Sequence, residues 1–449
     1  MVKPKIYLET HGCTMNRADS EAIFRILKES NFEITSSPEE ADLLILNTCN
    51  VKQPTEQRML SRAKTLSLLN KPLIIAGCMA ATQPALIRRY AAALIGPKSI
   101  SIISNVAKEV LEGKRGIEIV EDLSINKAEM KRVPFSKVSA AIPVAEGCLG
   151  QCTYCITRFA RGRLKSYPPD SITRVIRGYV VEGFKEIYLT GQDLGVYGWD
   201  IGTNIAKLLK AIKEIKGEFR VRVGMMNPMG VKAIIDELLE SFSDRRIYKF
   251  FHMPVQSGSD KVLRLMKRGY SSKDFLEIVR RIRERYPIST IATDIIVGFP
   301  GESEEDFEQT VSLIKDVKPE VVNISKFGPR PGTEAAKMKK LPTKIVKERS
   351  RIVSELCAQI KLRRNEKLVG KEFYVLITEK YREKAQGRTG FYRPVLIEQE
   401  VELGSFYRVE IVGARSNYLI GKVIELLARR EVSGPCHIST ESGRWDLTP

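Results

Sequence analysis

Residues 146–155 read Glu-Gly-Cys-Leu-Gly-Gln-Cys-Thr-Tyr-Cys, which places Cys148, Cys152 and Cys155 on one short loop. Three thiolates at this spacing can hold three irons of a [4Fe–4S] cube and leave the fourth iron without a protein ligand. The two glycines of the loop let the backbone wrap closely around such a cluster. The alternative is a zinc site, which needs a fourth ligand that no neighbouring Cys or His supplies, so a distant residue would have to complete it. The spacing therefore favours a cluster with one open iron.

The cysteine loop follows the first of six strand-like stretches that alternate with helical patterns. The predicted strands are 140–145, 186–190, 219–224, 248–255, 290–299 and 321–327, and the predicted helices between them include 171–182, 204–216, 231–240, 272–285 and 303–315. Six repeats are fewer than the eight of a closed barrel. The sequence therefore predicts a partial, open parallel barrel with its site at the carboxyl ends of the strands.

Three further cysteines, Cys13, Cys49 and Cys78, each follow a short apolar run in a polar or glycine-bearing turn. The runs 6–8, 43–46 and 73–76 alternate with helical patterns, which predicts βαβ units and a parallel sheet. Because parallel strands point the same way, the three turns are expected to converge on one edge of the sheet, where three thiolates could hold a second cluster. The alternative is that each cysteine is a small core residue.

Residues 370–429 change character. They show four strand-like stretches and no helix, at 373–378, 391–397, 406–412 and 418–426. This pattern predicts a small antiparallel barrel, an architecture often used for RNA binding. A basic segment precedes it: residues 326–371 hold fourteen Lys and Arg against four Glu, a large part of the net charge of +19. Such a concentration is the electrostatic footprint of a nucleic-acid partner.

The remaining features bound the class of protein. A length of 449 residues with 43% hydrophobic and 28% charged residues predicts about three globular domains. No stretch approaches the roughly 20 apolar residues of a membrane helix, and the first residues leave no room for a signal peptide, so a cytoplasmic protein without membrane contact is expected. In a reducing compartment clustered cysteines indicate metal binding or catalysis. Cys357, in a helical pattern, and Cys436, in the polar tail, are interpreted as non-functional.

With both cysteine triads, the chain resembles the methylthiotransferase branch of the radical S-adenosylmethionine (SAM) enzymes. The segments THGCTMNRADS, LNTC and AGCMA are similar to the N-terminal domain of that family, whose three cysteines hold an auxiliary [4Fe–4S] cluster. The resemblance implies an α/β multidomain protein with an N-terminal methylthiotransferase domain over 1–125, and a radical SAM core with a basic helical extension over 126–369. A TRAM RNA-binding barrel would follow over 370–429, and a polar tail over 430–449.

Several segments are similar to the archaeal and eukaryotic branch, which converts N6-threonylcarbamoyladenosine at tRNA position 37 to its 2-methylthio derivative. They are NVKQPTE, GCLGQCTYCITRFARGRLKSYP, LTGQDLGVYGWDIGTN, MNPMG, HMPVQSGS, ATDIIVGFPGE and GPRPGTEAAKM. Alternatives are a methylthiotransferase for isopentenyladenosine in tRNA or for a ribosomal protein, although the latter enzymes usually carry Leu-Gln-His where this chain has Val255-Gln256-Ser257. An alternative from another class is an RNA-binding protein whose clusters are structural or redox-sensing.

The resemblance also implies a mechanism with two clusters and an electron donor of the ferredoxin or flavodoxin type. The cluster on Cys148, Cys152 and Cys155 would bind SAM and cleave it to a 5′-deoxyadenosyl radical. The auxiliary cluster on the other three cysteines would carry the sulfur and accept a methyl group from another SAM. Expected SAM contacts are Tyr154, Gly191, Gln192, Asp193, Gln256 and Ser257. Packing of the tyrosine and a plain strand-to-helix turn at 191–193 are the competing interpretations.

Basic and aromatic residues suggest contacts to the substrate. Arg158, Arg161 and Arg163 follow the cysteine loop and could meet phosphate or the threonylcarbamoyl carboxylate, or form a solvated basic face. In the last domain, charged and aromatic side chains mix in the manner of RNA-binding surfaces. These are Arg382, Lys384, Arg388, Arg393, Tyr381, Phe391 and Tyr392.

Overall fold

The computed structural model describes residues 3–426, which form two compact units. Residues 3–125 and 130–133 belong to one unit, and residues 126–129 and 134–426 belong to the other. Cys436 and the tail 430–449 lie outside the described residues. Within residues 3–426, none of the helices combines the length and apolar character needed to cross a bilayer.

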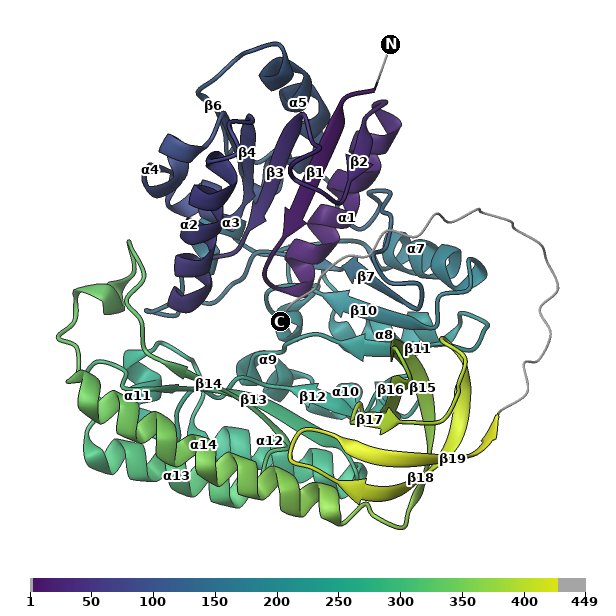
Figure 1. Ribbon diagram of the computed structural model, residues 1–449. Helices are drawn as coiled ribbons and strands as arrows, with labels where there is room; N and C mark the ends of the chain where they lie inside the picture. Colours follow the sequence, from purple (N-terminus) through teal and green to yellow (C-terminus); the bar gives the residue numbers. More distant parts are fainter. Residues whose placement is uncertain (1–2, 427–449) are drawn as a thin grey trace. The chain divides into compact units, whose positions relative to one another are not determined.

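The first unit is built on a six-stranded parallel sheet in the order β2-β1-β3-β4-β5-β6 (Figure 1). Its strands are β1 Lys5–Thr10, β2 Glu33–Thr35, β3 Leu43–Thr48, β4 Leu73–Gly77, β5 Ala93–Ile95 and β6 Ile117–Ile119. Its helices are α1 Thr14–Glu29, α2 Gln53–Ser67, α3 Cys78–Thr82, α4 Pro84–Ile87 and α5 Ile103–Leu111, with 3-10 turns η1 Arg88–Tyr90 and η2 Pro97–Ile102. The predicted parallel sheet is confirmed. The sequence pattern missed β2, β5 and β6, because three residues are too few to show a period.

The central strands β3 and β4 of this sheet are buried on both faces. β3 and β4 are buried along their whole length, and side chains such as Leu44 and Ile75 pack against Met59 and Leu66 of α2. The strand order places β1 between β2 and β3, so successive connections leave β1 in opposite directions. Parallel α/β sheets bind ligands at such a switch point, outside the carboxyl ends of the strands.

The second unit contains six parallel core strands in two sheets, in the orders β11-β10-β7 and β12-β13-β14. An isolated bridge between Val221 and Ile247 joins the two sheets. The strands are β7 Ser139–Pro143, β10 Glu186–Thr190, β11 Arg220–Val223, β12 Phe250–His252, β13 Thr290–Val297 and β14 Val321–Lys326, and a short antiparallel pair is formed by β8 Ala145–Glu146 and β9 Lys165–Ser166. The predicted partial parallel barrel is confirmed, with the six strands in chain order.

The helices around this barrel match the sequence pattern with one exception. They are α6 Thr157–Arg161, α7 Pro169–Val181, η3 Leu194–Val196, α8 Ile205–Lys213, α9 Pro228–Ala233, α10 Ile235–Ser241, α11 Asp260–Leu265, α12 Ser272–Arg285, α13 Glu304–Val317, η4 Glu334–Lys337 and α14 Thr343–Glu366. The predicted helix 231–240 is broken at Ile234, whose backbone leaves the helical region. By contrast, α12 has the predicted bounds, because Ser271 and Asp274 form a capping box at its start.

The C-terminal strands form a closed barrel in the order β15-β16-β17-β19-β18. They are β15 Glu372–Tyr381, β16 Lys384–Thr389, β17 Pro394–Ile397, β18 Phe406–Ala414 and β19 Leu419–Leu426. The predicted all-antiparallel arrangement is wrong at one place, because β17 and β19 pair in parallel. The sequence pattern also missed β16, in which Ala385 is the one aliphatic side chain that turns into the barrel.

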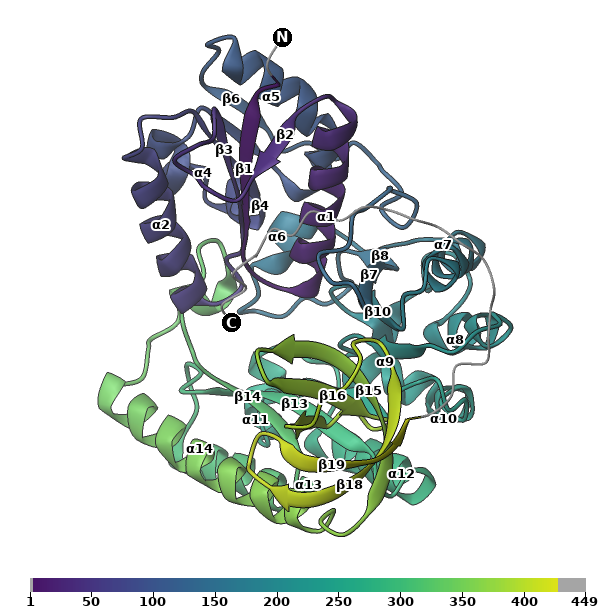
Figure 2. The same ribbon diagram turned by 45° about the vertical axis from the view of Figure 1, so that its right-hand side comes forward.

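This small barrel belongs to the second unit (Figure 2). Its contacts fall at the amino ends of the core strands, and the cysteine loop follows their carboxyl ends. The Lys249 amide donates to the Gly390 carbonyl oxygen at 2.9 Å. The Tyr392 ring lies 4.8 Å from that of Tyr248, measured between ring centroids, and the guanidinium of Arg220 lies 4.8 Å from the centroid of the Phe406 ring. The turn before β17 therefore packs against the amino end of the partial barrel.

Four of the seven residues predicted as an RNA surface contribute to this internal packing. Phe391 and Arg393 are buried, the side chain of Tyr392 packs between core aromatics, and the Arg388 guanidinium lies over the Tyr392 ring at 4.8 Å. The predicted RNA contact is wrong for these four. Tyr381, with 55% of its surface exposed, remains on the outside together with Arg382 and Lys384.

Candidate functional site

The loop that carries Cys148 is folded tightly against the chain that follows it. Gly147 has a φ of +79°, and a Cβ atom at this position would lie 2.0 Å from the carbonyl oxygen of Arg163. The Cys148 amide also donates to the Gly162 carbonyl oxygen at 3.3 Å. Only glycine satisfies both the left-handed backbone and this close approach, so Gly147 sets the start of the loop.

The sulfur atoms of Cys148 and Cys152 lie close to Gly150. The Gly150 amide donates to Cys148 Sγ at 3.1 Å, and a Cβ on Gly150 would lie 3.2 Å from Cys148 Sγ and 3.6 Å from Cys152 Sγ. Burial raises the pKa of the Cys148 thiol to about 12, and it also raises the pKa of Cys155. Desolvated thiols become thiolates when a metal replaces their protons, so this side-chain set fits three irons of a cluster.

The thiolates of a [4Fe–4S] cube bind separate irons and are spaced more widely than the ligands of a single ion. Within residues 3–426, no group of three His, Cys, Asp or Glu side chains is arranged to hold a single metal ion.

A buried group of charges lies directly behind the loop. Glu146 accepts from Lys127 Nζ at 2.9 Å and from Arg161 Nη1 at 2.7 Å. All three residues are buried, and two cations oppose one carboxylate. Arg161 therefore points into the protein, and the prediction that it contacts substrate is wrong. Arg163 stays exposed and Arg158 is half-buried.

A second arginine, which the sequence analysis did not single out, reaches a cysteine of the loop. Arg268 Nη1 donates to Cys152 Sγ at 2.9 Å. Arg268 is separated from Cys152 by 116 residues and lies just after α11. No local motif connects the two residues, so only the tertiary fold reveals this contact.

The segment 191–193 is brought to the cysteine loop. Gln192 Oε1 accepts from the Gly147 amide at 2.6 Å, and Gly191 lies beside the carbonyl oxygen of Ala145. Asp193 Oδ1 accepts from the Gly195 amide at 3.0 Å and the Asn227 amide at 2.8 Å, and burial raises its pKa to about 6. These contacts hold the loop and the strand ends in place.

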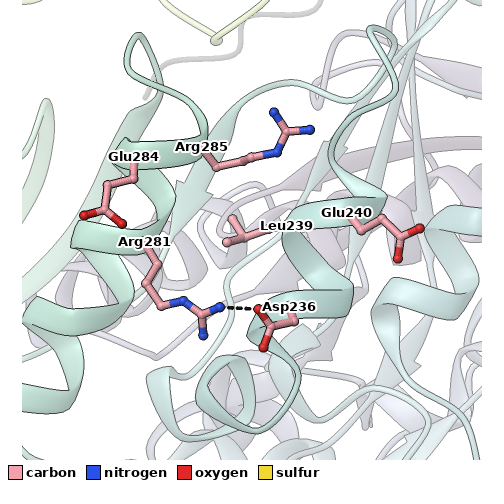
Figure 3. Close-up of a pocket in the computed structure, with 6 residues that line it drawn as sticks. All are labelled: Asp236, Leu239, Glu240, Arg281, Glu284 and Arg285. Carbon is pink, nitrogen blue, oxygen red and sulfur yellow. Dashed lines mark hydrogen bonds and ion pairs between the residues drawn. The ribbon is translucent and has the colours of Figure 1, made fainter.

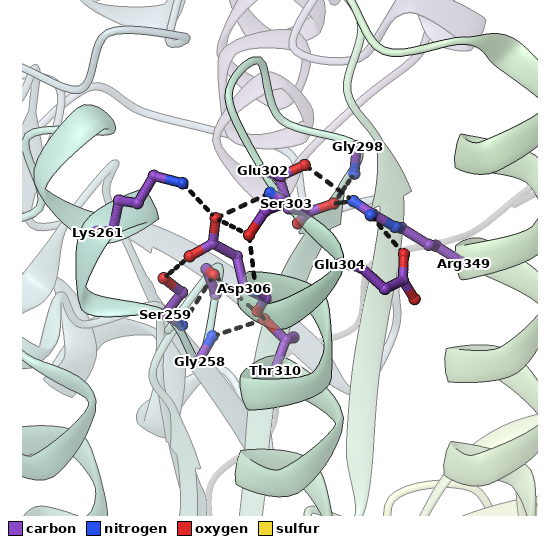
Figure 4. Close-up of polar contacts among 11 residues, drawn as sticks. Gly258, Ser259, Lys261, Gly298, Glu302, Ser303, Glu304, Asp306, Thr310 and Arg349 are labelled. Atoms are coloured by element: carbon purple, nitrogen blue, oxygen red, sulfur yellow. Dashed lines mark hydrogen bonds and ion pairs between the residues drawn. The ribbon is translucent and has the colours of Figure 1, made fainter.

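Of the other predicted SAM contacts, Tyr154 lies in the cysteine loop, and Gln256 and Ser257 follow β12. Figure 4 shows the next residues, Gly258 and Ser259, bound to α13. Ser257 is fully buried, and its hydroxyl lies 3.2 Å from that of Thr310 on α13. Gln256 has a φ of +74° and pairs with Ile295 of β13. Tyr154 packs edge-on against Phe299, with ring centroids 6.3 Å apart.

In the same region, two carboxylates hold these turns through hydrogen bonds and ion pairs (Figure 4). Asp306 accepts from Ser259 Oγ at 2.7 Å and from Lys261 Nζ at 2.8 Å, which fixes the QSGS turn to α13. Glu302 Oε2 accepts from the Gly298 amide at 2.8 Å and from Arg349 Nη1 at 2.6 Å, which fixes the GFPGE turn to α14. Both turns are thus held rigidly at the carboxyl ends of the strands.

In the first unit, Cys13, Cys49 and Cys78 follow β1, β3 and β4 at the carboxyl edge of the sheet. Gly12, with a φ of +115°, lies so close to Cys49 that a Cβ would come within 2.4 Å of Cys49 Cβ and 3.0 Å of its Sγ. The turn of Cys13 therefore lies directly against Cys49. Because β1, β3 and β4 are neighbours in the sheet, the three turns lie at the same edge, as predicted.

Asn16, one turn into α1, connects all three cysteine turns. Its Nδ2 atom donates to the carbonyl oxygens of His11 and Thr48, both at 2.8 Å. The Cys78 thiol lies 3.8 Å from Asn16 Oδ1. Asn16 is fully buried, so one side chain joins the ends of three strands. The sequence analysis missed it, although it stands three residues after Cys13.

The hollow between α10 and α12 is separate from both triads (Figure 3). It has a volume of about 490 Å³ and is lined by Asp236, Leu239, Glu240, Arg281, Glu284 and Arg285. Arg281 pairs with Asp236 across it, and none of the predicted site residues lines it.

Comparison with known proteins agrees with this arrangement. Residues 142–314 match the family described as the radical SAM superfamily. Residues 5–95 match the one described as uncharacterized protein family UPF0004. The two matches contain the two cysteine triads.

The chain is similar over nearly its whole length to curated relatives. A probable threonylcarbamoyladenosine tRNA methylthiotransferase of Pyrococcus horikoshii is 43% identical over 94% of this chain and 99% of the relative. A threonylcarbamoyladenosine tRNA methylthiotransferase of Danio rerio is 34% identical over 94% of this chain and 78% of the relative.

Among solved structures, the radical SAM methyltransferase TsrM from Kitasatospora setae, with cobalamin and a [4Fe-4S] cluster bound, has a similar fold. The TM-score is 0.57 at 14% identity, over 75% of this chain and 77% of that protein. At this identity the likeness concerns the fold alone.

Proposed function

The chain belongs to the threonylcarbamoyladenosine tRNA methylthiotransferase family of radical SAM enzymes, and from that premise we propose that it adds a methylthio group to C2 of N6-threonylcarbamoyladenosine at position 37 of tRNA. The observation that carries the proposal is the pair of three-cysteine sites. Each site stands at the carboxyl edge of a parallel sheet, and each belongs to its own compact unit.

In the proposal, Cys148, Cys152 and Cys155 hold a [4Fe–4S] cluster whose open iron binds SAM. When bound and reduced, this group supplies a 5′-deoxyadenosyl radical for abstraction of hydrogen from the substrate. The protein positions the cluster loop through Gln192, which accepts from Gly147. The turns after β12 and β13 would border the bound SAM, with Gln256 in the left-handed conformation.

The second [4Fe–4S] cluster is proposed on Cys13, Cys49 and Cys78. The switch-point position and the close approach of Gly12 to Cys49 support it. Cys13 precedes the first turn of α1, where the positive end of the helix dipole favours a thiolate. Asn16 holds the three turns together. This cluster would provide the sulfur that becomes part of the methylthio group.

Substrate recognition is assigned to charge on the second unit. α14 carries exposed basic side chains at Lys344, Lys347 and Arg363, and the exposed Lys367 directly follows the helix. Exposed positive charges attract the phosphate backbone without reading the sequence. The outer face of the small barrel adds Tyr381, whose ring offers a surface for base stacking. An electron donor of the ferredoxin or flavodoxin type completes the scheme.

The experiment is an anaerobic assay of the reconstituted protein with SAM, a reductant and tRNA that carries N6-threonylcarbamoyladenosine. Nucleosides are then separated and weighed by mass spectrometry. We expect the methylthio mass on the threonylcarbamoyl nucleoside, with 5′-deoxyadenosine as co-product. Methylthiolation of isopentenyladenosine or of a ribosomal protein instead would move the chain to another substrate class. Absence of 5′-deoxyadenosine would favour a structural or redox-sensing role for the clusters.

A further inference from the structure

Arg268 is a buried cation that contacts the cysteine loop. It is 7% exposed, and Nη1 donates to Cys152 Sγ at 2.9 Å. Nη2 donates to the Pro254 carbonyl oxygen at 2.9 Å, and Nε donates to the Tyr270 hydroxyl at 3.0 Å. Three nitrogens of the planar guanidinium are therefore fixed at once, and one of them faces a cysteine sulfur.

The charge of Arg268 lacks the kind of partner that other buried arginines have. Arg161 pairs with Glu146, and Arg349 pairs with Glu302. In the described part of the chain, Arg268 forms no ion pair with a carboxylate, and its oxygen partners are a carbonyl and a hydroxyl. An unpaired buried charge is costly. Arg268 instead donates to the sulfur of Cys152, and its charge also interacts with the more distant Asp193 carboxylate.

The backbone around Arg268 encloses the cysteine loop from the same side. The Thr153 amide donates to the Met266 carbonyl oxygen at 3.2 Å, and the Thr153 hydroxyl donates to that of Leu265 at 2.9 Å. The residues before Arg268 are thus bonded to the residue after Cys152. The distance between the guanidinium and the sulfur is set by the fold rather than by a flexible side chain.

We propose that Arg268 sets the reduction potential of the cluster on the Cys148 loop, by donating a hydrogen bond to the Cys152 sulfur and by holding a fixed positive charge beside it. The inference rests on the first cluster of the proposed function. Reduction adds one electron from an external one-electron donor, and no bond forms or breaks. The cluster becomes more negative by one charge, and a nearby cation in a water-poor site stabilises that state. Hydrogen bonds to cluster sulfurs act in the same direction.

Tyr270 acts as the positioning residue for Arg268. Its hydroxyl accepts from Arg268 Nε and lies 3.0 Å from the Pro254 carbonyl oxygen and 2.9 Å from that of Val255. These carbonyls directly precede Gln256 at the end of β12. Tyr270 therefore fixes one edge of the guanidinium to the strand end, and its loss should loosen the contact with Cys152 without removing the charge.

The test is an anaerobic redox titration followed by electron paramagnetic resonance, with dithionite as reductant. It uses the full-length chain in which Cys13, Cys49 and Cys78 are replaced by Ala, so that one cluster is observed. In this background Arg268→Gln is expected to lower the ratio of reduced to oxidised cluster about tenfold at a fixed potential, which is a shift of about 59 mV to more negative values for one electron. Tyr270→Phe should give a smaller shift of the same sign.

Lys267→Gln is the matched control, because it removes one positive charge from the neighbouring position. Lys267 is half exposed and pairs with Glu334, so its replacement should leave the midpoint potential unchanged. An unchanged potential in Arg268→Gln with full iron content would overturn the inference. If Arg268→Gln does not retain iron, the test uses Tyr270→Phe. A wild-type midpoint potential in Tyr270→Phe would overturn the inference, and a more negative potential would support it.

The readout separates this inference from the proposed function. A shifted potential in a protein that fails to modify tRNA would leave the role of Arg268 intact and remove the proposed substrate. An unchanged potential in Arg268→Gln, together with normal tRNA modification by the wild type, would remove the role of Arg268 and leave the proposed substrate intact.

Discussion

The two cysteine triads each bring three cysteines to the carboxyl edge of a parallel sheet, but the chain assembles them differently. Cys148, Cys152 and Cys155 lie within one loop, where Gly147 and Gly150 shape the turn. The other triad is spread over residues 13–78 and is assembled by the order of β1, β3 and β4. The first site is encoded by local spacing, and the second exists only where the parallel sheet has formed. The comparison teaches that equal ligand sets can differ in their dependence on tertiary structure.

The largest effect should separate the two triads by reaction step. Replacing Cys148, Cys152 and Cys155 by Ala is expected to abolish SAM cleavage, because the open iron is lost. Replacing the other triad by Ala should leave 5′-deoxyadenosine formation and abolish methylthiolation of tRNA. Chromatography of SAM products and mass spectrometry of tRNA nucleosides measure both. The matched control is Cys357→Ala, a core cysteine outside both triads, which should retain both activities.

The distributed triad should be sensitive to Asn16 in a way that the local triad is not. Asn16→Ala removes the hydrogen bonds to the buried carbonyl oxygen of Thr48 and the partly buried one of His11, which costs about 1–3 kcal/mol of unfolding free energy. We expect partial or complete loss of the iron of the first unit, while SAM cleavage persists. Iron analysis and chemical denaturation measure the two effects.

Asn105→Ala provides the control for this change, since it removes an exposed asparagine from α5 in the same unit. It should alter neither iron content nor stability. Full iron content in Asn16→Ala would show that strand order alone assembles the site.

The smallest effect concerns pH and the second unit. Ser259, Lys261 and Ser303 donate to Asp306 and hold its pKa below the usual aspartate range despite burial. A lowered pKa in the folded state stabilises the protein above the unfolded value of about 3.9, and this contribution is lost as pH falls through the folded pKa. The difference in unfolding free energy between wild type and Asp306→Asn should be about 1 kcal/mol at pH 6 and should shrink toward pH 3.

Chemical denaturation of the cluster-free protein at the two pH values measures this difference, with tryptophan fluorescence as the probe. Trp199 lies in the second unit. A difference that stays constant between pH 6 and pH 3 would contradict the assignment of a stabilising charge to Asp306.

The fold was predictable where the chain carries long periodic patterns or strong caps. α12 has its predicted bounds because a capping box marks its start. The continuous apolar run of β3 predicted a strand that is buried on both faces. Short elements carry too little pattern. β5 has three residues, and β16 carries polar side chains on one face and little apolar signal on the other.

The candidate site was predictable in its cysteines and not in its supporting residues. The loop spacing can be read locally, whereas Arg268 reaches Cys152 across 116 residues. The predicted RNA surface was partly wrong for a related reason. Composition does not reveal which side of a barrel is covered by the rest of the protein. Arg393 and Tyr392 have the character of RNA contacts, yet they seal the amino end of the core.

The central claim is that two separate three-cysteine sites each hold one [4Fe–4S] cluster. The most direct measurement is the iron and sulfide content of the anaerobically reconstituted wild type and of the two triple Cys→Ala variants. The account predicts about eight irons in the wild type and about four in each variant. About four in the wild type and none in the variant lacking Cys148, Cys152 and Cys155 would contradict it, because the first unit would then hold no cluster.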